Sequence, residues 1–420
     1  MNLLSHGPAE TRFLCRALSR RGASASELEQ LAGSLDWERC LERATPVLLP
    51  YLGHALPGRL PQAAVPIWVT HRLAAVTRAS AALQLQRRHE LRRVLAALAG
   101  AGVPVIVLKG MALADLVFPD PALRPMVDID LLVPAPDWER ARAVLLGIGL
   151  RVPERWVVRP ATGPASKAER DKPFERPGTA VLFELHDRLE WMREPFVYDL
   201  DAAWRRSLPA RLLGDLEVRV LAPEDMLLHL GMHLSSYHAF EHGLRDLLDV
   251  TLLIERNAYE WPRLAEGWLR QGTAGWMRLT LTLARDLLGA GVPDAVLTRL
   301  PQPAEFDSAA RMALGQLWSA PLQRVPPGIV SVLAARDLGA GASQTLARLN
   351  PWRTEEGVRA ALRRACVDLA TRVPRYVAAL SGGHLAPRAL RRAVSLRRER
   401  QALASLMAPT EAPQRDPVPS

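Results

Sequence analysis

The feature that most constrains the fold is a change of hydrophobic period near residue 103. Apolar residues recur at helical spacing over 66–98, whereas residues 103–108 (VPVIVL) form a short β-branched run between glycines. Such runs are typical of buried strands. Further strands are expected at 127–133, 180–186 and 217–221. Because helical patterns flank this stretch on both sides, the sequence predicts an α+β fold, a small mixed sheet between N-terminal and C-terminal helical regions.

The strand-forming stretch divides the chain into four expected segments. They are an N-terminal helical region (1–99), an α/β core (100–222), a C-terminal helical domain (223–407) and a disordered tail (408–420). Within the core, proline, glycine and charge at about 153–178 predict a flexible excursion between strands. Helices of the C-terminal domain are expected at 223–237, 244–255, 261–270, 276–288, 303–319, 355–380 and 387–406.

Composition places the chain among globular proteins. Apolar residues make up 49% and charged residues 23% of the 420, which excludes disorder of the whole chain. The longest uncharged run, 94–108, is broken by glycine and proline, so no membrane span is expected. The N-terminus lacks the basic start and apolar stretch of a signal peptide, and the three cysteines lie far apart. A cytoplasmic location is therefore expected.

The net charge of +10 says little about nucleic acid. Lysine occurs at only three positions, so 51 of the 54 basic residues are arginine, which is typical of a GC-rich genome. A basic surface favours anionic partners such as nucleotides. The basic helix expected at 387–406 leaves an RNA or membrane-surface contact open, but a solvated face explains it better. No RNA-binding module is recognisable, which argues against nucleic acid as the partner.

Two aspartates in the second expected strand are the first candidates for chemistry. Side chains alternate along a strand, so Asp128 and Asp130 share one face and Ile129 packs on the other. Two carboxylates on one buried face repel unless a cation lies between them. The sequence predicts a site for Mg²⁺ or Mn²⁺. The alternative is that one aspartate faces solvent at the strand end.

A third carboxylate follows in the next expected strand. In LFELH, Glu184 and His186 lie on one face and Phe183 on the other. If this strand pairs beside 127–133, Glu184 completes a three-carboxylate cluster. Two ions about 4 Å apart on such a cluster activate an attacking hydroxyl and hold leaving pyrophosphate. The alternative is a solvated glutamate on an edge strand.

The turn after the first strand is a candidate phosphate site. Gly110 lets a backbone approach phosphate, the following N–H groups form an anion cradle, and Lys109 adds a point charge. Arg124 is close enough in sequence to the aspartates to reach triphosphate oxygens. An ordinary glycine turn and an ordinary loop arginine are the alternatives.

Together these motifs resemble a known family. LKG at 108–110, Arg124, DIDLLV at 128–133 and FELH at 183–186 are similar to the uncharacterised bacterial nucleotidyltransferase family of the DNA polymerase beta superfamily. LLHLGMH at 227–233 and LRDLLD at 244–249 resemble the histidine-bearing helix and the following helix of that family. The resemblance extends over about residues 10–380.

The resemblance implies roles for particular residues. Asp128, Asp130 and Glu184 would be the metal ligands and catalytic carboxylates. Lys109 and Gly110 stand where the wider superfamily has a Gly-Ser turn that holds triphosphate. Met111 follows Gly110 here, so phosphate binding would depend on backbone N–H groups and Lys109 instead of a hydroxyl. Glutamate as the third carboxylate is a second departure.

Histidines of the C-terminal region are candidates for an acceptor pocket. His229 and His233 lie one helical turn apart, with His238 and His242 just beyond. We expect His186, His229, His233 and Asp246 to line a pocket opposite the carboxylates. Zinc binding and simple packing at a domain interface are the alternatives for these histidines.

Two functions remain open from the sequence, and a third, an RNA-directed transferase, has only the basic helix expected at 387–406 in its support. The first is an enzyme that transfers a nucleoside monophosphate from an NTP to a hydroxyl of a small molecule, peptide or protein, with metal-assisted release of pyrophosphate. The second is a nucleotide-binding or scaffold protein on the same fold, with weak turnover or none. The acceptor, the preferred NTP and the oligomeric state are not specified by the sequence.

Overall fold

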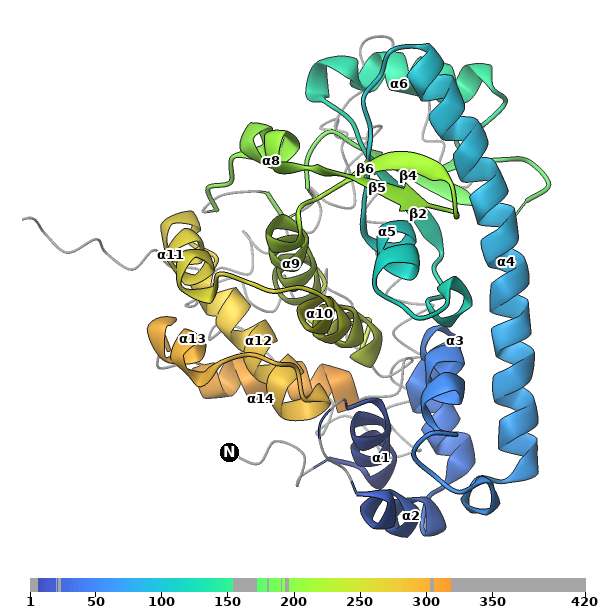
Figure 1. Cartoon of the computed structure of the whole chain (residues 1–420), viewed down its shortest axis with the longest axis vertical. Helices are drawn as coiled ribbons and strands as arrows, with labels where there is room; N and C mark the ends of the chain where they lie inside the picture. Colours follow the sequence, from blue (N-terminus) through green and yellow to red (C-terminus); the bar gives the residue numbers. More distant parts are fainter. Residues whose placement is uncertain are drawn as a thin grey trace, which may run out of the picture.

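A computed structural model describes residues 7–318 of the chain, apart from 20, 22–23, 154–171, 180, 190, 193–195 and 303–305. The helices expected at 355–380 and 387–406, the tail and most of the excursion at 153–178 lie outside the described residues. The expected α+β class is confirmed, because a mixed sheet is flanked by helices from both sides of the sequence (Figure 1).

The N-terminal region is helical, as expected. It contains α1 (Ala9–Leu18), α2 (Ala25–Gly33), α3 (Trp37–Ala55) and α4 (Ile67–Gly100). Ser24 caps the N-terminus of α2 and Asp36 caps that of α3, because the side chain of each accepts a hydrogen bond, 3.1 Å long, from the backbone N–H three residues further on. Helix α4 runs from the α2–α3 end of the molecule past the sheet to α6 (Figure 1).

The middle of α4 differs from the expected apolar stripe. Leu83 belongs to the apolar pattern over 66–98, which predicts that it is buried, but it is 39% exposed. The buried face there carries Ser80, Gln84 and Arg87 instead. Ser80 donates to the carbonyl of Ala122, and Gln84 to those of Pro121 and Arg124, so this turn of α4 meets loop backbone and not a hydrophobic core.

The sheet has six strands in the order β3-β4-β2-β1-β6-β5. They are β1 (Ile106–Val107), β2 (Asp128–Leu132), β3 (Phe174–Glu175), β4 (Leu182–His186), β5 (Leu208–Leu212) and β6 (Leu216–Val220). The pairs β2–β4 and β1–β6 are parallel, and the others are antiparallel. The four expected strands are confirmed. Strand β1 is shorter than expected because Pro104 has no N–H to donate, and β3 and β5 were not expected.

The remaining α-helices of the described residues are α5 (Lys109–Leu116), α6 (Trp138–Gly147), α8 (Leu200–Arg206), α9 (Pro223–Met232), α10 (Leu244–Arg256), α11 (Trp261–Gln271), α12 (Ala274–Leu288), α13 (Asp294–Arg299) and α14 (Phe306–Trp318). Of these, α8 and α13 were not expected. The helix expected at 223–237 changes type, because α9 gives way to a π-helical turn at His233–Tyr237. Among the described residues, no helix is both long and apolar enough to cross a membrane.

A buried ion pair joins the C-terminal helices to the sheet. Arg124, in the loop before β2, donates from Nε and Nη2 to the two carboxylate oxygens of Asp249 on α10, at 3.2 and 2.6 Å. Both side chains are almost fully buried. A bidentate pair in this position fixes α10 against the loop that carries the chain into Asp128.

We expect Asp249→Ala to lower the free energy of unfolding by about 3–5 kcal/mol, because it leaves the Arg124 guanidinium buried without its partner. Chemical denaturation measures the change. The matched control is Asp294→Ala, which removes the exposed partner of Arg285 and should barely alter stability. Equal, small effects of both substitutions would contradict the importance of the buried pair.

Candidate active site

Three carboxylates and a histidine converge on one face of the sheet. Strands β2 and β4 are parallel, with Asp130 opposite Glu184 and Leu132 opposite His186. Side chains alternate along each strand, so Asp128, Asp130, Glu184 and His186 share this face. On the other face, Ile129, Leu131, Phe183 and Leu185 are buried. The expected alternation is confirmed, and the edge-strand alternative for Glu184 is wrong, because β4 lies between β2 and β3.

Within this face, Asp130, Glu184 and His186 form the most compact group. The Nε2 atom of His186 lies 2.9 Å from Oδ1 of Asp130 and 3.6 Å from Oε2 of Glu184. One ligand atom from each of the three lies within 4.8 Å of the others. The two carboxyl groups fit a divalent cation such as Mg²⁺ or Mn²⁺, whereas the imidazole is a ligand more typical of transition metals. Asp128, which was expected as a ligand, lies outside this compact group.

Lys109 lies against the carboxylates. It is the first residue of α5, with a φ of 38°, which is strained for a residue other than glycine. Its Nζ atom is 3.0 Å from Oδ1 of Asp130 and 3.2 Å from Nε2 of His233. The ammonium group is thus an internal cation, which offsets part of the negative charge that the strands bring together.

Burial and mutual repulsion raise the pKa values of the carboxyl groups. Burial raises the pKa of Asp128 above its usual range, and the neighbouring Asp130 adds to the effect against the opposing charge of Lys109. Burial and Asp130 likewise raise the pKa of Glu184 to about 7, although His186 opposes the rise. The site is therefore short of positive charge, and a bound divalent cation would relieve the repulsion.

Arg124 and Gly110, both expected to bind nucleotide, contact other residues of the chain. The guanidinium of Arg124 is held by Asp249, as described above. A Cβ atom on Gly110 would lie only 3.1 Å from Nη1 of Arg124 and 3.2 Å from Sδ of Met126. Glycine thus lets the loop before β2 approach α5 closely. A contact of either residue with nucleotide stays a prediction.

The residues expected to form an acceptor pocket are linked by contacts, because the ring of His233 lies 5.8 Å from that of His229 and 6.4 Å from that of His242, the partner of Asp246. His186 is beside the carboxylates, and His233 touches Lys109. His229 is fully buried and accepts a hydrogen bond from the indole N–H of Trp191 at 3.1 Å. Asp246 accepts from His242 at 2.8 Å and from Arg245 at 2.6 Å. Of the four residues, His186 contacts the carboxylates and His233 contacts Lys109, and a shared acceptor pocket stays a prediction.

Arg87 is a candidate that the sequence analysis missed. It is 5% exposed and lies one turn along α4 from Gln84, which binds the loop leading into β2. Its Nε atom has no hydrogen-bond partner in the described part of the chain. Burial lowers its pKa, and Asp128 is the charge that opposes this effect. The sequence could have indicated Arg87 only through its position on the buried face of α4. The apolar pattern over 66–98 did not identify that face correctly.

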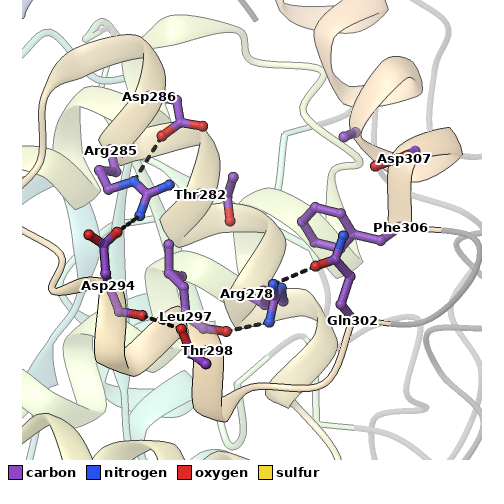
Figure 2. Close-up of a pocket in the computed structure, with 11 residues that line it drawn as sticks. Arg278, Thr282, Arg285, Asp286, Asp294, Leu297, Thr298, Gln302, Phe306 and Asp307 are labelled. Atoms are coloured by element: carbon purple, nitrogen blue, oxygen red, sulfur yellow. Dashed lines mark hydrogen bonds and ion pairs between the residues drawn. The ribbon is translucent and has the colours of Figure 1, made fainter. Parts of the chain in front are cut away.

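A separate pocket lies among the C-terminal helices, formed by residues of α12, α13, α14 and the chain between them (Figure 2). It is a cavity of 390 Å³, and none of its lining residues belongs to the sheet. Arg285 pairs with Asp286 and Asp294, and Arg278 donates to Oε1 of Gln302 at 2.6 Å. The positive charge of Arg285 in this pocket is thus neutralised by aspartates that also line it.

The sequence also matches a family model. Residues 28–289, more than half of the chain, match the model described as uncharacterised nucleotidyltransferase. The chain belongs to this nucleotidyltransferase family. The matched region contains the carboxylate face, Lys109, Arg87 and the helices α9 and α10. A search of curated proteins found no match.

We expect the thermal stability of the metal-free protein to fall as pH rises through the range of about 5 to 8. The pKa of Glu184 is about 7 in the folded protein against an ordinary value of 4.5. The folded state therefore holds a proton that the unfolded state has lost, and raising the pH favours unfolding. Melting temperatures of wild type and Glu184→Gln, measured in chelator, test this. The variant should lack this part of the decline, and identical pH profiles would contradict the raised pKa.

Proposed function

We propose that this nucleotidyltransferase, on a fold of the DNA polymerase beta superfamily, transfers a nucleoside monophosphate from an NTP to a hydroxyl of a small molecule, peptide or protein. The observation that carries the proposal is the convergence of Asp130, Glu184 and His186 with Lys109 beside them. The family match supports transfer chemistry in general.

The proposed reaction balances as a displacement at the α-phosphorus. The acceptor oxygen forms a new P–O bond, the bond to the β-phosphate breaks, and pyrophosphate leaves. The hydroxyl proton passes to a carboxylate of the site. Bound Mg²⁺ or Mn²⁺ would supply charge neutralisation for the reacting phosphates. Asp130 and Glu184 with His186 would hold the ion, and Asp128 is positioned to contribute from the same strand face.

Two cations of the chain are suited to hold the triphosphate. Lys109 would exchange the carboxylate of Asp130 for a phosphate oxygen once a metal ion occupies that carboxylate. Arg87 presents a buried guanidinium that has no hydrogen-bond partner at Nε in the described residues, and guanidinium groups bind phosphate through paired donors. We assign Arg124 a positioning role, because Asp249 already occupies its Nε and Nη2 donors.

One observation favours the second function, a nucleotide-binding protein without turnover. The ammonium of Lys109 lies 3.0 Å from Asp130, where it competes with any metal ion for this carboxylate. If nucleotide binding did not displace it, the ion needed for transfer would not bind. Release of pyrophosphate separates the two functions.

We expect Asp130→Asn to lower pyrophosphate release by at least about a hundredfold, because the electrostatic stabilisation of the reacting phosphates depends on this carboxylate. The assay offers each of the four NTPs with Mg²⁺ or Mn²⁺ and a panel of hydroxyl acceptors, including serine-, threonine- and tyrosine-containing peptides. Asp215→Asn, which changes an exposed aspartate outside the site, is the matched control. Release at the wild-type rate by Asp130→Asn would refute the proposed reaction.

Arg87→Met should weaken NTP binding by roughly tenfold or more, the effect of losing a hydrogen bond to a charged group. The metal-free variant should melt at the same or a higher temperature, because methionine fills the space without burying a charge. Isothermal titration and thermal unfolding measure the two effects. The matched control on the same helix is the exposed Arg78, changed to methionine. A large loss of stability with unchanged affinity would show that Arg87 is structural.

A further inference from the structure

A second group of potential metal ligands lies in the turn between α9 and α10. His238, Glu241 and His242 each offer one ligand atom, and these atoms lie within 4.8 Å of one another. All three residues are half-buried, so an ion would have access from solvent. The imidazole rings of His238 and His242 are close, with centroids 4.0 Å apart. Two imidazoles and one carboxylate form a donor set quite different from the oxygen-rich strand face.

The backbone of this turn is held in an unusual conformation. It follows the π-helical turn His233–Tyr237, and the non-glycine residues Ala239 and Phe240 have φ values of 48° and 63°. Such φ values cost energy for side chains with a Cβ and persist only where the surroundings enforce them. Phe240 is fully buried, and its N–H donates to the carbonyl of Leu234 at 2.9 Å. The core thus anchors the turn that carries the three half-buried ligand residues.

A buried carboxylate orients one of the imidazoles. Nδ1 of His242 lies 2.8 Å from Oδ2 of Asp246, and Asp246 in turn accepts from Nε of Arg245 at 2.6 Å. An imidazole that donates Nδ1–H to a carboxylate keeps Nε2 as an acceptor for a metal ion. Histidines that bind metal ions usually donate their other ring N–H to a carboxylate in this way. The contact with Asp246 is thus a second observation in favour of a metal site, separate from the proximity of the three ligand atoms.

We propose that His238, Glu241 and His242 form a second metal site, selective for Zn²⁺ over Mg²⁺. Imidazole ligands favour Zn²⁺, whereas Mg²⁺ prefers oxygen ligands. Three protein ligands leave the fourth tetrahedral position for water or an exogenous ligand. The short H-x-x-E-H spacing lies in a turn rather than on a helix, so the glutamate converges with the two histidines.

The proposed zinc site lies next to the carboxylate face. The ring centroid of His233 is 4.4 Å from that of His238, and Nε2 of the same His233 is 3.2 Å from Nζ of Lys109. One imidazole therefore separates the two sites. The proposal does not depend on the transfer reaction, because its evidence comes only from the turn and from Asp246.

The test is a zinc titration of the untagged full-length protein after removal of metal with a chelator. Asp130→Asn serves as the background, so that zinc on the carboxylate face does not obscure the result. Isothermal titration should show one equivalent of Zn²⁺, and Co²⁺ should give the visible absorption of a four-coordinate ion. His238→Ala and His242→Ala should each lose this equivalent, and excess Mg²⁺ should not displace the zinc.

Two further variants make the result specific. His89→Ala changes an exposed histidine on α4 and should retain the zinc. Asp246→Asn should weaken zinc binding about tenfold to a hundredfold through the orientation of His242. Zinc retained by both His238→Ala and His242→Ala, or no zinc bound by the background protein, would overturn the proposal. Far-UV circular dichroism of the half-buried His238→Ala variant shows whether the fold is intact.

Discussion

The parallel pairing of β2 with β4 brings Asp130 opposite Glu184, and much of the surrounding structure compensates for this repulsion. Lys109 adopts a strained backbone conformation and contacts Asp130 with its ammonium group. Asp128 is the charge that offsets the burial of Arg87 in α4. Two features of the chain thus accompany the buried carboxylates, the strained backbone of Lys109 and the buried guanidinium of Arg87. Metal ions and phosphate groups bound at the site would stabilise both arrangements.

Alternation along two short strands was enough to predict which carboxylates share a face. The sequence did not specify which residue of one strand lies opposite which residue of the other. However, side chains alternate with a period of two in both DID and FELH, so every register that pairs Glu184 with either aspartate places all three carboxylates on one face. The strands β3 and β5 were missed because β3 is too short to show a pattern and β5 contains Pro209, which argues against a strand except at the edge of a sheet, where β5 lies. Strand β3 has only two residues, and both faces of most of β5 are exposed or half-buried.

The ion pairs between residues far apart in the sequence were the part of the site that could not be predicted from it. Arg124 was expected to bind phosphate, but its guanidinium is engaged by Asp249, which lies 125 residues further along the chain. Arg87 went unnoticed for a related reason. An arginine on a helix is ordinarily solvated, and only the contacts of Ser80 and Gln84 with the loop show that this face of α4 turns inward. Charge and helical period do not identify a buried partner that is distant in sequence.

The contact between Lys109 and Asp130 has a consequence for the order of ligand binding. An ion that takes this carboxylate has to displace an ammonium group, and the displaced ammonium then needs a new anion nearby. In the proposed reaction, the triphosphate of the substrate would provide this anion. Under the proposed function, each ligand would therefore remove an obstacle to the other, and by thermodynamic reciprocity nucleotide would raise the affinity for the ion by the factor by which the ion would raise the affinity for nucleotide. A lysine that neutralises the carboxylates in this way would favour joint binding of ion and nucleotide over binding of either one alone.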